Sequence, residues 1–586
     1  MIYLNFGNDK ANQKTSLNNI YLEYCDKNKG IQIHYDHRKI VIVDGFFFNP
    51  EMLCREIGYK FSNNHAEIIF NLNEKETEKF IKKTDGFFNL FIFNRIDNTA
   101  RIYSDHVGSR TIFFTYSKKD LILSDDIKYV LIKSEKSQLN EAKVTEYFSF
   151  MNNFGGETFF DGIHEIKARE CIDFNQKSFS TREYFKFKAV TNKLTLKENS
   201  KLLRSSFLNS IKNCLSFYKG NMATALSGGL DSSSITSCVK HLGKKDFVAK
   251  TVTFENDSKS YELNYSQNVS SEKNIKQDII KLSKTGCISD LNNSWDIFAE
   301  PKNLVNGYIH HEIFRNLQAN NIEVYLDGFA GDSVINHGYT LFLKLAKEFR
   351  FFELIRLDKL IHKKKGGKYS LVRTFKKYIL PSLLSQKILW IFESFMPNRN
   401  LYKKLESKLT KKYRFNNLYH ELLKRYRSYP NSFHKSSEEW HLMNINSTQI
   451  TSSIRDAKTL ARFYDVNILF PFLSKELIQL SLEIPAEQKL FNGIDRYIFR
   501  EAMKGIVPSK ILERHTKSDL SFFSKKEVMN LDTHNLISRI NKICNGLYKK
   551  EFLEKRLKNK SIDFTEIYQI LEFTEWLERN KFYLNK

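Results

Sequence analysis

Cysteine is sparse in this sequence of 586 residues, and its spacing excludes two kinds of cross-link. The seven cysteines are odd in number, lie far apart and include no pair separated by two residues. Disulfide frameworks and structural zinc sites both need closely or regularly spaced cysteines. We therefore expect neither. The cysteines stand at positions 25, 54, 171, 214, 238, 287 and 544.

Long apolar runs are also missing. The first ten residues carry no basic flank followed by an apolar stretch, the pattern of a leader segment. The most apolar later stretch, residues 379–396, is interrupted by Pro381, Lys387 and Glu393. A membrane-spanning helix needs about 20 predominantly apolar residues. We expect a soluble, cytoplasmic protein with no membrane span.

Acidic residues are outnumbered: 67 Asp and Glu face 92 Lys and Arg, and the formal charge is +25. Such a balance suits an acidic partner or a nucleotide substrate, and equally a basic, solvated surface. No recognised nucleic-acid-binding motif accompanies the charge, so nucleic acid is not the partner we expect. The hydrophobic content of 41% indicates a folded protein, and the length predicts two or more domains.

The sequence does contain two regions of different pattern. Residues 1–190 are rich in short apolar runs bounded by turn signals, such as Ile40–Val43 and Phe87–Phe93, and these runs predict strands. In residues 191–586, predicted helices alternate with short apolar strands such as 221–226. This alternation predicts an α/β domain with a parallel sheet, whose ligands bind beyond the carboxyl ends of the strands.

One loop that follows such a strand is built of small residues. The stretch Ala223–Ile235 predicts a strand, a turn and a helix. At Ser227, Gly228 and Gly229 backbone N–H groups can close on an anion, and the helix start also favours negative charge. Asp231 would repel a bare phosphate, but it fits if a divalent cation lies between carboxylate and phosphates. The loop is not a Walker A motif, because the Gly-Lys-Ser/Thr ending is absent.

A second loop follows the predicted strand at 322–326. Its glycines, Gly328 and Gly331, permit close backbone approach. Asp332 then places a second carboxylate just after a strand, at the same edge of the predicted sheet as Asp231.

The stretch Ser227–Ser233 resembles the pyrophosphate-binding loop of the asparagine synthetase family. Those enzymes cleave ATP to AMP and pyrophosphate, forming an acyl-adenylate that an amine converts to an amide. The resemblance implies ATP and Mg²⁺ as cofactors, with Asp231 and Asp332 holding the metal and taking part in catalysis. It also implies a set of nucleotide-binding residues: Ala225, Leu226, Ser227, Gly228, Gly229, Asp231, Ser232, Ser233, Asp327 and Gly328.

Further matches to the family lie near the C-terminus. Phe470–Ser474 matches a core segment, with Ser474 where the family has Asp, and Gly493–Met503 matches the helix that follows it. Residues 506–519 match the segment that carries the family's essential lysine. The resemblance thus assigns to Lys517 the stabilisation of charge on the α-phosphate as the adenylate forms and breaks.

The N-terminal region matches the family's glutaminase domain, an Ntn-type sandwich of two antiparallel sheets between helical layers. Asp85–Phe93 and Ser104–Phe114 match two of its strand segments. The chemistry is lost, however: Ile2 replaces the nucleophilic cysteine, residues 44–46 read Asp-Gly-Phe for the glutamine-holding Asn-Gly-Glu, and residues 65–67 read His-Ala-Glu for a pair of acids. We expect a scaffold without glutaminase activity, so the attacking amine must come from elsewhere.

Two more features bear on which family reaction the chain performs. Phe329 stands where asparagine synthetases have glutamate and β-lactam synthetases have tyrosine for acid–base chemistry, and a phenyl ring can serve neither role. His337 is then a candidate base. Residues 339–440 predict a basic helical insertion, either a solvated surface or a docking surface for an acidic peptide or partner protein.

The resulting expectation is an AMP-forming carbon–nitrogen ligase that closes a macrolactam in a peptide. The runs Gly331–Gly338 and Arg514–Asp519 resemble lasso-peptide macrolactam synthetases. The expected partners are a peptide or small-molecule carboxylate, and a precursor peptide with its leader peptidase. Two alternatives stay open: ammonia-dependent amidation of a small carboxylate or sugar acid, and a non-catalytic nucleotide-binding protein.

Overall fold

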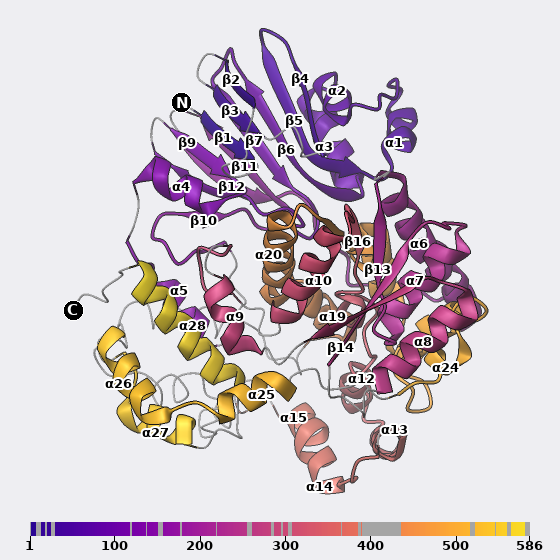
Figure 1. Ribbon diagram of the computed structural model, residues 1–586. Coiled ribbons are helices and arrows are strands. Elements are labelled where there is room, and N and C mark those ends of the chain that lie inside the picture. Colours follow the sequence, from indigo (N-terminus) through magenta and orange to yellow (C-terminus); the bar gives the residue numbers. More distant parts are fainter. Residues whose placement is uncertain are drawn as a thin grey trace. The chain divides into compact units, whose positions relative to one another are not determined.

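The computed structural model divides the chain into two compact units (Figure 1). Unit 1 holds residues 1–144, 151–187 and 447–455, and unit 2 holds the rest. The structure describes residues 2–6, 13–17, 20–24, 30–117, 120–135, 138–149, 156–175, 178–217, 220–254, 261–282, 286–294, 297–302, 307–364, 366–384, 388, 435–515, 522–544, 547–558 and 564–580.

Unit 1 is a sandwich of two six-stranded sheets. One sheet has the order β10-β8-β9-β1-β3-β2 and the other the order β12-β11-β7-β6-β5-β4. The strands of the first sheet are β1 (Ile2–Phe6), β2 (Gln13–Leu17), β3 (Ile20–Tyr24), β8 (Phe113–Tyr116), β9 (Leu121–Ser124) and β10 (His164–Glu165). Those of the second are β4 (Ile31–Tyr35), β5 (Lys39–Phe47), β6 (Gly86–Asn94), β7 (Thr99–Ser104), β11 (Glu170–Asn175) and β12 (Ser178–Glu183). Pairing is antiparallel, as predicted, except that β1 runs parallel to both β3 and β9.

Strand β5 shows why its sequence is apolar throughout. Successive side chains of a strand point to opposite faces. Ile40 and Ile42 pack into the core between the two sheets. Val41 and Val43 pack into a second core, which side chains of the helices α1 (Pro50–Ile57), α2 (His65–Phe70) and α3 (Glu74–Lys83) complete (Figure 1). Helix α4 (Ile127–Ser134) packs on β8 and β9. The predicted helical layers are therefore present.

Unit 2 is built on a five-stranded parallel sheet in the order β15-β14-β13-β16-β17. Its strands are β13 (Met222–Ala225), β14 (Val248–Phe254), β15 (Gln277–Leu282), β16 (Val324–Leu326) and β17 (Asn467–Leu469). The strand order grows away from β13 on both sides, so the topological switch point lies between β13 and β16. Ligands of open parallel sheets bind at that point, outside the carboxyl ends of the strands.

Helices cover both faces of this sheet. Helices α7 (Leu230–His241) and α8 (Tyr261–Lys273) lie on one side, and α10 (Gly307–Ala319) lies on the other (Figure 1). The other helices of the sheet region are α6 (Leu196–Phe217), α9 (Cys287–Ser294), α11 (Gly331–Ile335), α19 (Ser437–Ile445), α20 (Thr448–Phe463), the 3₁₀ turn η5 (Pro471–Leu473), α21 (Lys475–Glu483), α22 (Ala486–Lys489), α23 (Tyr497–Ala502) and α24 (Ser509–Leu512). The first part of α20, up to Arg455, groups with unit 1.

Two helical regions complete unit 2. The described part of the predicted insertion holds α12 (Leu341–Lys347), α13 (Phe351–Lys364), α14 (Leu371–Thr374), a π-helical turn η2 (Phe375–Ile379) and α15 (Leu380–Leu383), whereas residues 389–434 lie outside the described part. The chain then ends in α25 (Phe522–Met529), α26 (Thr533–Ile543), α27 (Lys550–Lys558) and α28 (Phe564–Asn580). None of the helices formed by the described residues is both long and apolar enough to cross a membrane.

Candidate functional site

The first predicted loop folds back on the helix that follows it. The backbone N–H of Ser227 donates to the hydroxyl of Ser232 at 3.1 Å, and the two serine hydroxyls are hydrogen-bonded at 3.0 Å. Between them Gly228 has a φ of +75°, and a Cβ there would lie 2.7 Å from the Cβ of Tyr265. Only glycine fits, because both the backbone angle and the space exclude a side chain.

The start of α7 offers free polar groups. Its N-cap residue is Gly229, so no side chain caps the first turn. Helix N-termini carry partial positive charge and bind anions. The hydroxyl of Ser233 is buried in this turn and has no hydrogen-bond partner in the part of the chain that the structure describes. The turn therefore has the donors that a phosphate group needs.

The second predicted loop packs directly on the first. A Cβ at Gly328 would lie 2.9 Å from the backbone nitrogen of Ser232, and a Cβ at Gly331 would lie 2.6 Å from the Cγ of Asp231. Real Cβ atoms do not approach so closely, so both positions need glycine. The close backbone approach expected from these two residues is thus an approach of one loop to the other.

Asp231 and Asp332 converge on one nitrogen atom. The Nη1 of Arg496 donates to the Oδ1 and Oδ2 of Asp231 at 2.8 and 2.9 Å and lies 2.6 Å from the Oδ1 of Asp332. Burial alone would lower the pKa of Arg496, but the neighbouring carboxylates outweigh burial and raise it. A single cation can therefore meet both predicted metal ligands.

This arrangement fits Mg²⁺. The donors are carboxylate oxygens, which hard divalent cations prefer, and the guanidinium stands in for the cation's charge. In the described residues no group of three or more His, Cys, Asp or Glu side chains is arranged to hold a metal. Two carboxylates suffice for Mg²⁺ in nucleotide sites, because substrate phosphates and water supply its other ligands.

Asp495, the residue before Arg496, accepts hydrogen bonds from three other side chains. The Nδ1 of His337 lies 3.3 Å from its Oδ2, the hydroxyl of Tyr339 donates to the same oxygen at 3.1 Å, and the Nη2 of Arg500 lies 3.3 Å from its Oδ1. The Nε2 of His337 lies 3.7 Å from Asp332. Because both ring nitrogens of His337 face carboxylates, the geometry favours a linking role over the role of base suggested by the sequence.

The segment that leads to Lys517 is anchored to the first loop. Arg514 is buried, its Nη1 donates to the carbonyl of Gly228 at 2.9 Å, and its guanidinium carbon lies 4.3 Å from the ring centre of Tyr265. The Nη1 of Arg500 donates to the carbonyls of Leu512 and Arg514 at 2.7 and 3.0 Å. Lys517 itself lies outside the described residues, so its role stays a prediction.

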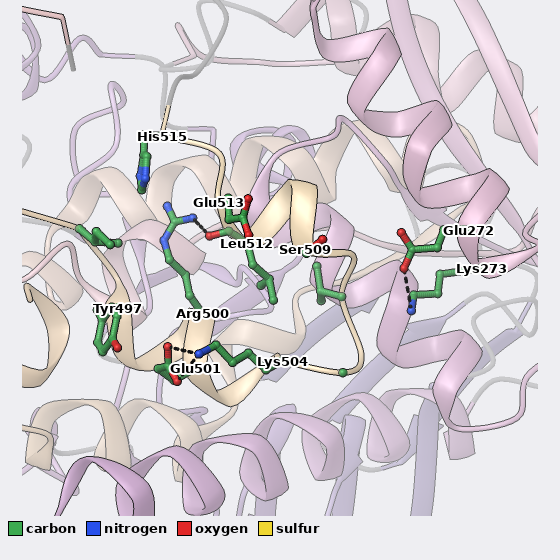
Figure 2. Close-up of a pocket in the computed structure, with 13 residues that line it drawn as sticks. Glu272, Lys273, Tyr497, Arg500, Glu501, Lys504, Ser509, Leu512, Glu513 and His515 are labelled. Atoms are coloured by element: carbon green, nitrogen blue, oxygen red, sulfur yellow. Dashed lines mark hydrogen bonds and ion pairs between the residues drawn. The ribbon is translucent and has the colours of Figure 1, made fainter. Parts of the chain in front are cut away.

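A cavity of about 630 Å³ lies beside this segment, between α8, α23 and α24 (Figure 2). Arg500 points from its wall toward the carbonyl of Leu512. Two other pairs of charges line the wall: Lys504 with Glu501 at 2.7 Å and Lys273 with Glu272 at 3.4 Å. None of the predicted nucleotide-binding or metal-binding residues lines this cavity. The cavity is therefore separate from the predicted site.

Sequence reasoning missed three arginines that organise the site: Arg496, Arg500 and Arg514. All three lie within the C-terminal segments that match the family. A signal was present in the spacing of Arg496 and Arg500, which is one helical turn. Their partners, however, are up to 286 residues away in sequence, as for Arg514 and Gly228.

Phe329 is placed where it can only pack. Its ring meets that of Phe470 edge to face, with ring centres 5.6 Å apart. Its backbone N–H donates to the Oδ1 of Asp327 at 2.8 Å. The residue at the position of the family's acid–base group therefore supplies an apolar surface, and the nearest carboxyl to it in sequence is Asp327.

In unit 1 the positions that would hold glutamine contain other groups. Asp44 forms an ion pair with Arg110. The ring of Phe46 packs against Phe48 and Phe87, with ring centres 5.5 and 6.4 Å away. Burial lowers the pKa of His65 to about 4, and its Nδ1 accepts the N–H of Phe47 at 3.2 Å.

The described cysteines of unit 1, Cys54 and Cys171, are poor nucleophiles. Both are buried, and burial raises the pKa of each thiol, to about 12 for Cys171. A reactive cysteine needs a lowered pKa and access to solvent. Cys25 lies outside the described residues.

Comparison with known proteins agrees with this geometry. The family model for asparagine synthase matches residues 202–578, and that for the glutamine amidotransferase domain matches residues 10–185. Asparagine synthetase [glutamine-hydrolyzing] 1 of Bacillus subtilis (strain 168) is 22% identical over 581 residues, which cover 94% of this chain and 87% of that protein. The putative asparagine synthetase [glutamine-hydrolyzing] 2 of Methanocaldococcus jannaschii is 21% identical over 34% of this chain and 40% of its own length.

Solved structures resemble only parts of the chain. NMN synthetase from Francisella tularensis is 17% identical, with a TM-score of 0.18, over 24% of this chain and 58% of that one. Glutamine-dependent NAD+ synthetase from Acinetobacter baumannii, in complex with ADP, is 10% identical with a TM-score of 0.19, over 48% and 70%. Likenesses this weak add nothing to the assignment, which rests on the family models, and the family model that spans residues 202–578 shows that this chain belongs to the asparagine synthase family.

Proposed function

We propose that this chain forms an amide within a peptide: it adenylates an Asp or Glu side chain with ATP, and an amine of the same peptide displaces AMP. The product is a macrolactam, as in lasso-peptide maturation. One contrast carries the proposal. Unit 2 has the two carboxylates that a nucleotide-bound cation needs, whereas the positions of unit 1 that the resemblance assigns to glutamine hold an ion pair of Asp44 and Arg110 and the ring of Phe46.

The residues of unit 2 have separate tasks in this proposal. The N–H groups at the start of α7 and the hydroxyls of Ser232 and Ser233 bind the pyrophosphate portion of ATP. Asp231 and Asp332 hold Mg²⁺, which when bound neutralises negative charge on the phosphates. Lys517 stabilises charge on the α-phosphate while the adenylate forms, and Arg500 and Arg514 hold the segment that leads to it.

Loss of the glutaminase site determines where the amine comes from. A chain that makes no ammonia must use free ammonium or an amine that the substrate brings. An amine tethered close to the adenylate reaches effective concentrations of about 10⁵ M or more when well oriented. The tether therefore compensates for the absent ammonia supply, and we favour the intramolecular amine.

The experiment combines purified protein, ATP and Mg²⁺ with synthetic peptides that carry a free N-terminal amine and one Asp or Glu side chain. We expect some peptides to lose one water, with one AMP formed for each product. Matched peptides with an acetylated N-terminus should give no cyclic product. Efficient conversion of free aspartate and ammonium to asparagine, with no dependence on peptide, would overturn the proposal.

A further inference from the structure

Asp327 follows β16 at its carboxyl end, the edge of the parallel sheet where ligands bind. Its backbone N–H donates to the carbonyl of Leu469 at 3.0 Å, and the next residue, Gly328, contacts the first loop at Ser232. Asp327 as a whole residue is half-buried. The N–H of Phe329 on its Oδ1, at 2.8 Å, is its one hydrogen bond within the described part of the chain. A second carboxyl oxygen is thus left for another group.

A histidine on α10 acts on this carboxyl through its charge. His310 lies near the start of α10, interacts electrostatically with Asp327, and has a buried Nδ1 that makes no hydrogen bond within the described residues. The other titratable group that interacts with Asp327 is Tyr325, buried on β16. From α20 the ammonium of Lys458 lies 5.9 Å from the ring centre of Phe470, which packs on Phe329.

Burial raises the pKa of the Asp327 carboxyl, although His310 and the N–H of Phe329 act in the opposite direction. A carboxyl moved upward from its ordinary range accepts and releases protons more effectively near neutral pH. The loop therefore has no acid–base group at Phe329, but two residues earlier it carries a carboxyl whose pKa is raised.

We propose that Asp327 is the general base of amide formation. The inference rests on the proposed function. The lone pair of the amine nitrogen forms the C–N bond at the carbonyl carbon of the acyl-adenylate. The C–O bond to AMP breaks, and its electron pair leaves on the phosphate oxygen of AMP. The proton that the nitrogen loses passes to the carboxylate of Asp327.

Neighbouring groups are less suited to this role. The ring of Phe329 carries no acid or base, and both nitrogens of His337 already face the carboxylates of Asp332 and Asp495. Asp231 and Asp332 both form ion pairs with Arg496. Of the three carboxyls on these two loops, Asp327 is the one that does not pair with Arg496.

The test separates adenylation from amide formation. Asp327→Asn keeps the shape of the side chain and removes the base. We expect amide formation to slow by ~10²–10⁴ more than ATP–pyrophosphate exchange does, the usual contribution of a positioned base. Hydroxylamine should still capture the adenylate as a hydroxamate. The matched control is Asp246→Asn, an exposed aspartate two residues before β14, which should leave both steps unchanged.

A pH profile supplies the second measurement. In wild type the rate of amide formation should fall tenfold per pH unit below the pKa of Asp327, because protonation removes the base. This acidic limb should vanish in Asp327→Asn and shift in His310→Gln. Equal losses of exchange and amide formation would show that Asp327 acts only as a nucleotide contact and would overturn the inference. Absence of exchange in the wild-type protein with every peptide would instead contradict the proposed function.

Discussion

Arg496 meets Asp231 with one nitrogen, which donates to both carboxylate oxygens at 2.8 and 2.9 Å. The same nitrogen lies 2.6 Å from Asp332, so a protein cation occupies the place between the two predicted metal ligands. The carboxylates attract a positive charge whether the nucleotide is present or not. Mg²⁺ and Arg496 should therefore compete for them.

Replacing either carboxylate should remove the reaction. Asp231→Asn and Asp332→Asn should each lower turnover by at least ~10², the scale for loss of one charge contact to the reacting centre. The measurement is Mg²⁺-dependent formation of AMP and pyrophosphate from ATP. Formation of ADP and phosphate by the wild-type protein would contradict the assignment of the loop.

Removing Arg496 should destabilise the protein in a way that Mg²⁺ offsets. Arg496→Gln takes the shared cation away from two partly buried carboxylates, and breaking such a pair costs about 3 kcal/mol. We expect a lower thermal midpoint, partly restored by Mg²⁺ and ATP. Lys504→Gln breaks an exposed ion pair with Glu501 and should change the midpoint little. Equal loss with and without Mg²⁺ would show that the two cations do not share a site.

Lys517→Ala should lower turnover by ~10²–10³ and leave ATP binding nearly intact, because its charge is needed most as negative charge builds in the transition state. The measurements are steady-state turnover and equilibrium binding of ATP. Arginine should rescue poorly, since its planar fork differs from a compact ammonium. Parallel loss of binding and turnover would indicate ordinary ground-state binding.

Glutamine should not serve as a nitrogen source. At the positions that the resemblance assigns to glutamine binding, Asp44 pairs with Arg110 and the ring of Phe46 packs against Phe87, and the thiols of Cys54 and Cys171 are buried with raised pKa values. We expect no glutamate release above buffer and no rise in product when glutamine is added. Glutamate released at the rate of product formation would refute this.

Stability should fall between about pH 5 and pH 8 because of Glu572. This buried carboxyl accepts hydrogen bonds from the hydroxyls of Tyr147 and Tyr568, and burial raises its pKa to about 8. In this interval the unfolded chain releases the proton that the folded chain keeps. The contribution is therefore present below the unfolded pKa and is lost as pH rises through 8.

Urea unfolding at pH 6 and pH 8 tests the effect of Glu572. Wild type should lose about 1–3 kcal/mol of unfolding free energy over this range, at ~1.4 kcal/mol per pH unit for one proton. Glu572→Gln keeps the shape in a neutral form and should lose less. An identical pH dependence in the two proteins would exclude Glu572 as the cause.

The local features of this protein follow from its sequence. The run of apolar residues in β5 is buried on both faces, the small residues at 227–229 form the turn before α7, and Gly328 and Gly331 allow two loops to touch. Each depends on strand period, backbone freedom or helix start, which are properties of neighbouring residues. The same local patterns predict that both carboxylates lie at one edge of a parallel sheet.

Only the tertiary structure decided which side chains surround Asp231 and Asp332. Arg496 reaches Asp231 across 265 residues, and Arg514 reaches Gly228 across 286. No local pattern indicates such partners, because their approach depends on how helices pack on the sheet. The parallel pairing of β1 with β3 and β9, and the grouping of Ser447–Arg455 with unit 1, have the same origin. The sequence thus placed the acidic groups, and long-range packing decided which cation stands between them.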